Sequence, residues 1–178
     1  GAVLRVQSEY ALAIKCFEES IKLAKKLDDC QMVAHNLQRL GFTYFLDQQG
    51  DLAISHSQKA IKIAEKHQLT HLLNRAQQTI ARVKAKQGKH EEALQAALDA
   101  TLNFFKEADN PTVQANSLAK QEFFYNQCHE WLNDVISGLP SDELKKQYAL
   151  YLVQAWKKAG LAEKCAGLAI TLSDIANI

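Results

Sequence analysis

Hydrophobic positions recur at helical spacing along most of the chain. One apolar face is formed by residues three or four apart: Val33, Leu37, Leu40, Gly41 and Tyr44. A second face follows, made of small and aliphatic residues: Ala53, Ile54, Ala60, Ile61, Ile63 and Ala64. The pattern predicts two helices. Between them, Gln49-Gly50-Asp51 predicts a turn in which Gly50 takes the unusual backbone angles and Asp51 caps the second helix.

This pair of helices repeats along the sequence with a period of forty residues. A shift of forty aligns Gly1 with Gly41 and Ala81, Ala13 with Ala53 and Ala93, and Ser20 with Ala60 and Ala100. Small residues at these positions let two helices pack closely, and a larger neighbour such as Tyr44 fills the space beside them. In the third unit, Gly88 predicts the turn, and Glu91 and Glu92 fall in the first turn of the next helix, where acids favour the helix dipole. One hairpin cannot bury both of its faces, so successive hairpins are expected to stack.

The C-terminal part keeps the helical spacing but loses the register. "DNPT" (109–112) predicts a helix start with Asn110 as cap, and the apolar positions in 112–139 fit one long helix or a hairpin bent near Asn126. "GLPSDEL" (138–144) predicts a break and a new helix capped by Ser141. The last segment predicts a final hairpin, with Trp156 in the place of Tyr44, Gly160 in the turn and Cys165 in the place of Ala53.

These spacings resemble the tetratricopeptide repeat family. The matching residues are Gly1, Leu4, Ala13, Phe17 and Ser20 in the first unit, Leu37, Leu40, Gly41, Tyr44, Ala53 and Ala60 in the second, and Ile80, Ala81, Ala93 and Ala100 in the third. The sequence departs from the family at Ser57, where an aromatic residue is usual, and at Lys84, which stands where Tyr44 stands one unit earlier. The period of forty is similar to that of the subclass with extended second helices.

The resemblance implies an all-α fold, a right-handed α-solenoid of stacked antiparallel helix hairpins. About four to five hairpins are expected, the last two degenerate. Units starting near residues 1, 41 and 81 would fill 1–108, and degenerate repeats with a C-terminal cap would fill 109–178 of the same solenoid. Because Gly1 aligns with Gly41, the chain is expected to begin inside a first helix and to be part of a larger protein.

Composition narrows the choice of partners. A net charge of +1 argues against a global attraction to nucleic acid or to an anionic membrane. The sequence contains no run of 18 apolar residues, so no membrane span is predicted. The cysteines form no Cys-x-x-Cys pair, which predicts reduced thiols in a cytoplasmic protein, with a disulfide as the alternative: Cys16, Cys30, Cys128 and Cys165.

The sequence predicts no enzyme. It has no glycine-rich phosphate loop, no nucleophile elbow and no His-Glu-x-x-His motif, so neither a cofactor nor a metal is expected. His67 and His71 are four residues apart, but they are predicted to lie on either side of the bend between two units. They are therefore interpreted as exposed histidines and not as metal ligands.

The resemblance also implies a ligand-binding surface, because the first helix of each hairpin in tetratricopeptide arrays lines a groove. Nine residues correspond to that face: Arg5, His35, Gln38, Phe42, Phe45, Arg75, Gln78, Arg82 and Lys86. None is acidic, and residues 66–90 contain six Lys or Arg, three His and no Asp or Glu. We interpret them as a basic groove with an exposed floor of Phe42 and Phe45, suited to a peptide with acidic residues and one or two hydrophobic anchors. The alternative is a solvated helix face with chance clustering. The Lys and Asn carboxylate clamp of some family members is not expected, since Gln38 and Phe42 occupy its positions.

The expected function is therefore protein–protein interaction within a larger intracellular signalling or regulatory protein. The alternative is a sensory domain that binds a small signalling peptide or metabolite and controls an attached output domain, transcriptional or nucleotide-signalling. Nucleic-acid contact through residues 66–90 is the third hypothesis, and self-association also stays open.

Overall fold

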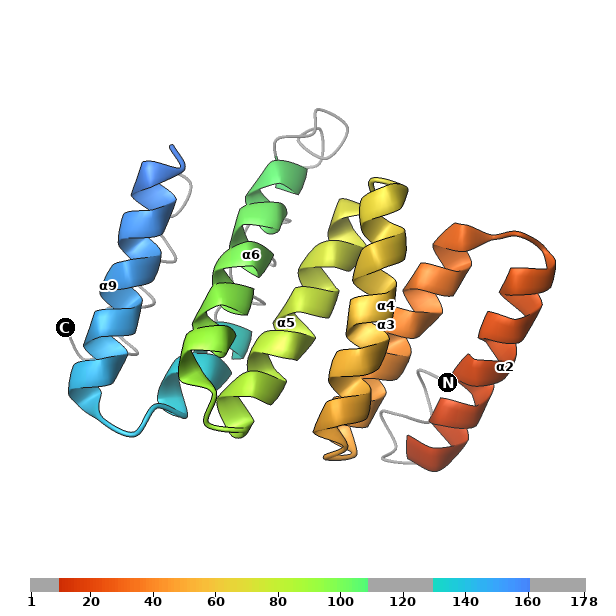
Figure 1. Cartoon of the computed structure of the whole chain (residues 1–178), viewed down its shortest axis with the longest axis horizontal. Coiled ribbons are helices and arrows are strands. Elements are labelled where there is room, and N and C mark those ends of the chain that lie inside the picture. Colours follow the sequence, from red (N-terminus) through yellow and green to blue (C-terminus); the bar gives the residue numbers. More distant parts are fainter. Residues whose placement is uncertain (1–9, 109–129, 161–178) are drawn as a thin grey trace. The chain divides into compact units, whose positions relative to one another are not determined.

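Helices account for nearly all of the described chain. The structure is a computed structural model in which residues 10–108 and 130–160 are described. The helices are α2 (Tyr10–Lys26), α3 (Cys30–Leu46), α4 (Gly50–Lys66), α5 (Thr70–Lys86), α6 (His90–Ala108) and α9 (Asp142–Lys158), with a further helix over residues 130–137 (Figure 1). No strand occurs in these two described ranges. The predicted all-α fold of helix hairpins is confirmed.

The helices follow one another with great regularity. Helices α3, α4 and α5 each have 17 residues. The helices from α3 to α6 begin at Cys30, Gly50, Thr70 and His90, which are 20 residues apart, so a hairpin of two helices recurs every 40 residues. The chain divides into two compact units, Gly1–Val83 and Lys84–Ile178. The boundary predicted near residue 108 stays a prediction.

Each turn between these helices is closed in the same way. After α3, the Gln49 N–H donates to the Tyr44 carbonyl at 2.9 Å and the Gln48 N–H to the Phe45 carbonyl at 3.2 Å, which is the Schellman pattern of a helix end. The residue after the cap takes a positive φ in every case: Asp28 (52°), Gln48 (61°), Gln68 (56°) and Gly88 (72°). The predicted role of Gly88 is confirmed.

The prediction for the turn before α4 is wrong in its details. Gln48, not Gly50, takes the left-handed backbone conformation, and Gly50 is the first residue of α4. The N-cap is Gln49, which makes no side-chain capping bond, and Asp51 lies in the first turn of the helix. The physical reason is that the Schellman hydrogen bonds fix the positive φ two residues after the last helical residue, whichever residue stands there.

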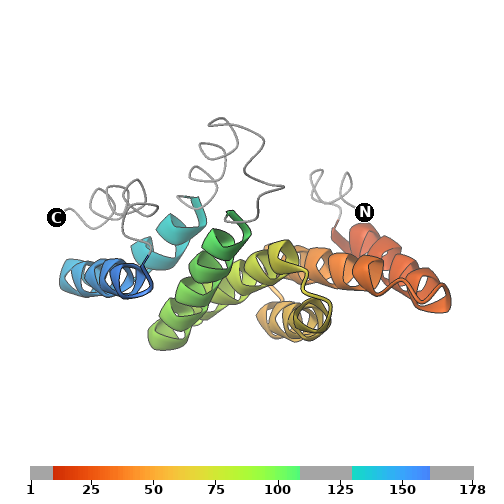
Figure 2. The same ribbon diagram turned by 90° about the horizontal axis from the view of Figure 1, so that it is seen from above.

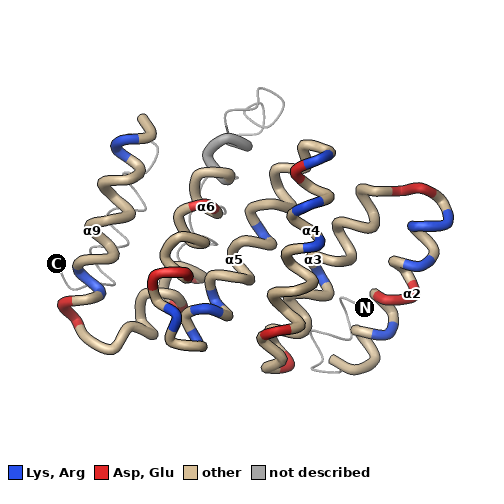
Figure 3. Tube along the Cα trace, in the orientation of Figure 1, with Lys and Arg blue, Asp and Glu red and all other residues tan. Residues whose placement is uncertain are grey.

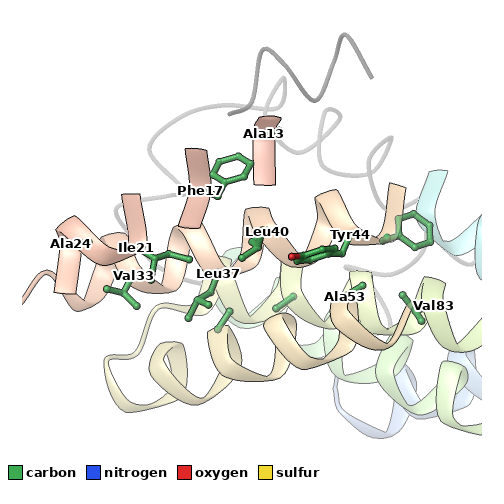
Figure 4. Close-up of a cluster of buried hydrophobic side chains, with 13 residues drawn as sticks. Ala13, Phe17, Ile21, Ala24, Val33, Leu37, Leu40, Tyr44, Ala53 and Val83 are labelled. Atoms are coloured by element: carbon green, nitrogen blue, oxygen red, sulfur yellow. The ribbon is translucent and has the colours of Figure 1, made fainter. Parts of the chain in front are cut away.

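The core of the first unit is centred on α3, which contacts both α2 and α4. The predicted stripe of α3 is buried, and Figure 4 shows Val33, Leu37, Leu40 and Tyr44 following one another along it. In Figure 2, α4 lies to one side of α3. The two helices meet at Gly41, where a Cβ atom would come within 2.5 Å of Ser57 Oγ and 3.1 Å of the Ala53 carbonyl oxygen. This contact explains why small residues recur at these positions.

In the second unit, α6 and α9 contact each other through a large residue. Trp156 is fully buried, as expected from its correspondence with Tyr44, and its indole N–H donates to Thr101 Oγ1 at 2.9 Å. Two further predictions are confirmed: Ser141 Oγ caps α9 by accepting from the Leu144 N–H at 3.2 Å, and Gly160 has a φ of 74° in the turn after that helix. The predictions for Asn110, Pro111, Asn126 and Cys165 lie outside the described residues, as does most of 112–139.

Candidate functional site

Charge is sorted between the helices of the first unit. Helices α3 and α5 contain no Asp or Glu, and the only charged residue of α3 is Arg39 (Figure 3). Helix α5 carries Arg75, Arg82, Lys84 and Lys86. In contrast, α2 and α4 each carry lysines together with acids. The acid-free character predicted for residues 66–90 therefore extends to the first helix of the preceding hairpin.

Phe42, Phe45 and Arg82 form one cluster between α3 and α5. The two rings are stacked, with centroids 5.9 Å apart and planes inclined by 24°. The guanidinium carbon of Arg82 lies 5.9 Å from each centroid, within the range of a cation–π interaction. The arginine therefore contacts the aromatic pair instead of standing apart from it on the helix face.

The expectation that both phenylalanines form an exposed floor is wrong for Phe45. Its side chain is only 7% exposed and belongs to the hydrophobic core of the unit, together with Val83 of α5. Phe42 is partly buried against the same core. The reason is that α5 packs on this part of α3, so Phe45 is covered by a helix that begins 25 residues later in the chain. In this cluster, Phe42 and Arg82 are the residues that stay partly exposed.

Four cationic or titratable side chains gather at the other end of the same helices. Burial lowers the pKa of His35 from 6.5, and the charges of Arg39, Arg75 and His71 lower it further. The pKa of the Arg39 guanidinium is also lowered, first by burial and then by Arg75. The charges that lower these two pKa values come from both α3 and α5. We call His35, Arg39, His71 and Arg75 the basic quartet.

The sequence predicted two members of the basic quartet as site residues, His35 and Arg75, but missed Arg39 as a site residue and treated His71 only as an exposed histidine. A signal for them exists. The spacing His-x-x-x-Arg occurs twice, at 35–39 and at 71–75, and each pair lies four residues apart on one helix face. The predicted bend between His67 and His71 is confirmed, since His67 is the C-cap of α4 and His71 lies in the first turn of α5.

Amides line the middle of the same helices. Gln38 is 5% exposed, and its Oε1 is buried without a hydrogen-bond partner in the described part of the chain. On α5, Gln78 Nε2 donates to Asn74 Oδ1 at 2.6 Å. A buried amide oxygen without a donor is costly, so it favours a ligand N–H or a water molecule at this point.

Two predicted site residues remain, Arg5 and Lys86. Arg5 is outside the described residues, and Lys86 is exposed in the last turn of α5, within the second unit. The departure at Lys84 has a structural explanation: its Nζ lies 2.6 Å from Glu92 Oε2 of α6. This hydrogen bond is the main reason why the pKa of Glu92 is lowered. Lys84 is therefore neutralised within the protein.

Within residues 10–108 and 130–160, no group of three or more His, Cys, Asp or Glu side chains is placed to hold a metal ion. Cys16 and Cys30 are free thiols, and Cys128 and Cys165 lie outside the described residues. None of the described helices is both long and apolar enough to cross a membrane.

Comparison with known families identifies the repeat. The model of the tetratricopeptide repeat matches residues 1–66, which confirms the resemblance for this part of the chain. No curated protein matches the chain. Tetratricopeptide repeats generally mediate protein–protein interactions and typically act as non-enzymatic scaffolds.

Proposed function

We propose that this repeat segment is a protein–protein interaction module whose α3/α5 face binds a peptide carrying acidic residues and a hydrophobic anchor. The observation that carries the proposal is the sorting of charge: α3 and α5 have no Asp or Glu and, besides Lys84, which pairs with Glu92 of α6, carry Arg39, Arg75, Arg82 and Lys86, whereas α2 and α4 carry both signs. Cations without intervening acids attract an acidic segment and orient it along the face.

Two features of the face support this choice of ligand. The guanidinium groups of Arg39 and Arg75 suit carboxylates and phosphates, which they bind through two parallel hydrogen bonds. Beside them, Phe42 and Arg82 offer an aromatic surface under a cation, where an apolar or aromatic side chain of the peptide can pack. Lys84 takes no part, because Glu92 already pairs with it.

The proposal also covers the larger protein to which the module belongs and the subclass of the repeat. We place the module in a larger cytoplasmic signalling or regulatory protein, as a scaffold without catalytic activity, and in the subclass with extended second helices. A sensory domain that binds a small signalling peptide or metabolite and controls an output domain stays the alternative. Nucleic-acid contact is less favoured, because a net charge of +1 gives little general attraction to phosphate backbones.

The proposal is tested by charge reversal on two helices. The probe is a fluorescein-labelled peptide with Phe and Leu among Glu residues, followed by anisotropy. Arg75→Glu with Arg82→Glu is expected to weaken binding by about 100-fold, since lost attraction is replaced by repulsion. The matched control is Lys59→Glu with Lys62→Glu, which makes the same charge change at exposed positions of α4.

The outcomes separate the hypotheses. If both double variants weaken binding equally, the attraction is general and not that of the α3/α5 face; if neither does, the face is not the site. Circular dichroism of each variant controls for folding, because Arg82 is packed on two rings. A duplex or single-stranded oligonucleotide is titrated in parallel, and binding with a steep salt dependence would favour nucleic-acid contact instead.

A further inference from the structure

The basic quartet is brought together by the packing of α3 and α5. Each helix supplies a histidine and, four residues later on the same face, an arginine. Ala34, Ala64 and Leu72 form one buried cluster, and His35 and His71 stand directly beside Ala34 and Leu72 in the chain. The two His-Arg pairs therefore flank a packed contact between these helices, with His35 and Arg39 partly buried and His71 and Arg75 exposed to solvent.

Within residues 10–108 and 130–160, no acidic side chain forms an ion pair with the basic quartet. In the described part of the chain, neither Arg39 nor Arg75 makes an ion pair, and Arg39 Nε is buried without a hydrogen-bond partner. The main-chain carbonyls of Arg39 and Arg75 accept hydrogen bonds from the Thr43 and Thr79 hydroxyls, which leaves the guanidinium groups uninvolved in these bonds. A buried guanidinium nitrogen without an acceptor is unfavourable unless a ligand supplies one, and Arg75, which is exposed, is accessible to the same ligand.

We infer that Arg39 and Arg75, with His35 and His71, form a binding site for a phosphate monoester carried by a side chain of the bound peptide. The inference rests on the proposed function for its ligand, but its geometry is separate from that of Phe42 and Arg82. A phosphate group carries up to two negative charges and presents three acceptor oxygens, so it can pair with both arginines at once. A carboxylate has one charge and would leave one guanidinium without a partner.

The histidines add a dependence on pH. The charges that act on His35 are those of Arg39 on its own helix and of Arg75 and His71 on α5, and no carboxylate of the described residues opposes them. The free site therefore favours neutral His35, because its pKa is lowered. A bound dianion reverses this field and favours the imidazolium, so binding takes up a proton. Affinity is expected to rise as pH falls from about 8 to about 6.5, and to fall below about 6, where the phosphate itself is protonated.

The test compares three peptides of one acidic sequence that differ at one position, which holds phosphoserine, Glu or Ser. Isothermal titration calorimetry on the full chain is expected to give at least about tenfold tighter binding of the phosphoserine peptide than of the Glu peptide. Arg39→Gln should abolish this preference. The matched control is Arg82→Gln, which removes one arginine of the same acid-free face outside the basic quartet and should keep the preference.

Proton uptake gives a second readout. In buffers of different ionisation enthalpy, the phosphoserine peptide should bind with net proton uptake at pH 7, and His35→Gln should reduce that uptake. Equal affinities for the phosphoserine and Glu peptides, or a preference that survives Arg39→Gln, would overturn the phosphate site while leaving the proposed function intact.

Failure of the proposed function looks different. If none of the three peptides binds, inorganic phosphate becomes the probe, and the melting temperature of the wild type is compared with that of Arg39→Gln. A phosphate-dependent rise in the melting temperature that Arg39→Gln removes would support the anion site and reject the peptide. No rise would overturn both. Arg39→Gln is not expected to unfold the chain, since it removes a repulsion between two cations.

Discussion

Helices α3 and α4 are the two halves of one hairpin and have the same length, yet they differ in how many residues they bury and of which kind. Ten residues of α3 are buried, among them Asn36, Gln38 and Thr43, because the helix contacts both α2 and α4. Helix α4 buries only four residues, all small: Ala53, Ser57, Ala60 and Ala64. The remaining positions of α4 are partly or fully exposed and include acids and lysines.

The difference indicates where function can reside. The buried stripe of α4 has only to allow close approach to α3, so its residues are explained by packing. On α3, Asn36 Nδ2 donates to Ser20 Oγ at 2.8 Å and Thr43 Oγ1 to the Arg39 carbonyl at 2.9 Å. These two polar residues are also explained by the fold. Gln38 and Arg39, each with a buried polar side-chain atom lacking a hydrogen-bond partner in the described residues, are not, and both lie on the proposed binding face.

The largest expected effect comes from enlarging the point where α3 and α4 touch. Gly41→Val places a branched side chain where a Cβ alone would lie 3.1 Å from the Ala53 carbonyl and 3.2 Å from the Ser57 nitrogen, both backbone atoms that cannot rotate away. We expect a loss of about 3 kcal/mol in the free energy of unfolding, measured by urea denaturation.

The control for this substitution is Gly138→Ala. A Cβ at Gly138 would meet nothing closer than the Asp134 carbonyl at 3.6 Å, an ordinary contact. Its effect is expected to stay within about 0.5 kcal/mol. An equally small effect at Gly41 would mean that α4 does not approach α3 as closely as the geometry requires.

The success at Gly41 shows which part of the fold the sequence predicts well. Close helix contacts require small residues at fixed spacing, and that spacing is local and repeated, so Gly41, Ala53 and the hairpin period were predicted. The turn residue Gln48 was missed because an amide side chain occupies a conformation that usually selects Gly. The backbone hydrogen bonds of the helix end fix that conformation. Because they do not depend on which side chain stands there, the sequence carries no signal for them.

The candidate site was predicted less completely, for a different reason. The exposure of Phe45 and the neighbours of Arg39 depend on how α5 packs against α3, between residues that are about 40 positions apart in sequence. The face of a helix follows from its periodicity, but its coverage by another helix does not. This is why the sequence predicted the acid-free surface but also predicted that Phe45 is exposed, and why it did not predict Arg39 as a site residue.

The next effect concerns the polar contact of α3 with α2. Ser20→Ala removes the acceptor of Asn36, whose side chain is 5% exposed and would be left with an unpaired amide donor. We expect a loss of about 1 to 2 kcal/mol in urea denaturation. The double variant Ser20→Ala with Asn36→Leu, which removes the orphaned amide as well, should recover part of this loss. No recovery would show that the cost arises from packing and not from the hydrogen bond.

The same substitution on α4 is expected to have the opposite sign. Ser57 is fully buried against Gly41, and its hydroxyl oxygen has no hydrogen-bond partner in the described residues. Ser57→Ala removes that hydroxyl, so we expect a gain of about 1 kcal/mol. A loss of stability in thermal and urea melts would mean that a water molecule or a residue outside the described ranges satisfies the hydroxyl, and that α4 is not a purely steric surface.

The smallest effect is expected from pH, and it separates the two helices through their histidines. Burial lowers the pKa of His35 on α3 and of His56 on α4 from 6.5, so the unfolded chain binds more protons than the folded one just below that pH. Stability should therefore be complete above about pH 6.5 and decline as the pH falls further towards 5. Only cations act on His35 in addition, whereas Glu18 opposes the effect of Lys59 on His56.

His35→Gln should consequently flatten the decline between pH 7.5 and pH 5 more than His56→Gln, as measured by urea denaturation at closely spaced pH values. The effect is small because both histidines are partly exposed and water screens their charges. If the two variants give the same pH profile, burial alone lowers both pKa values, and the cations around His35 are too far away to matter. If His35→Gln flattens the profile alone, the repulsion within the basic quartet is real in the free protein, as an anion site requires before its ligand arrives.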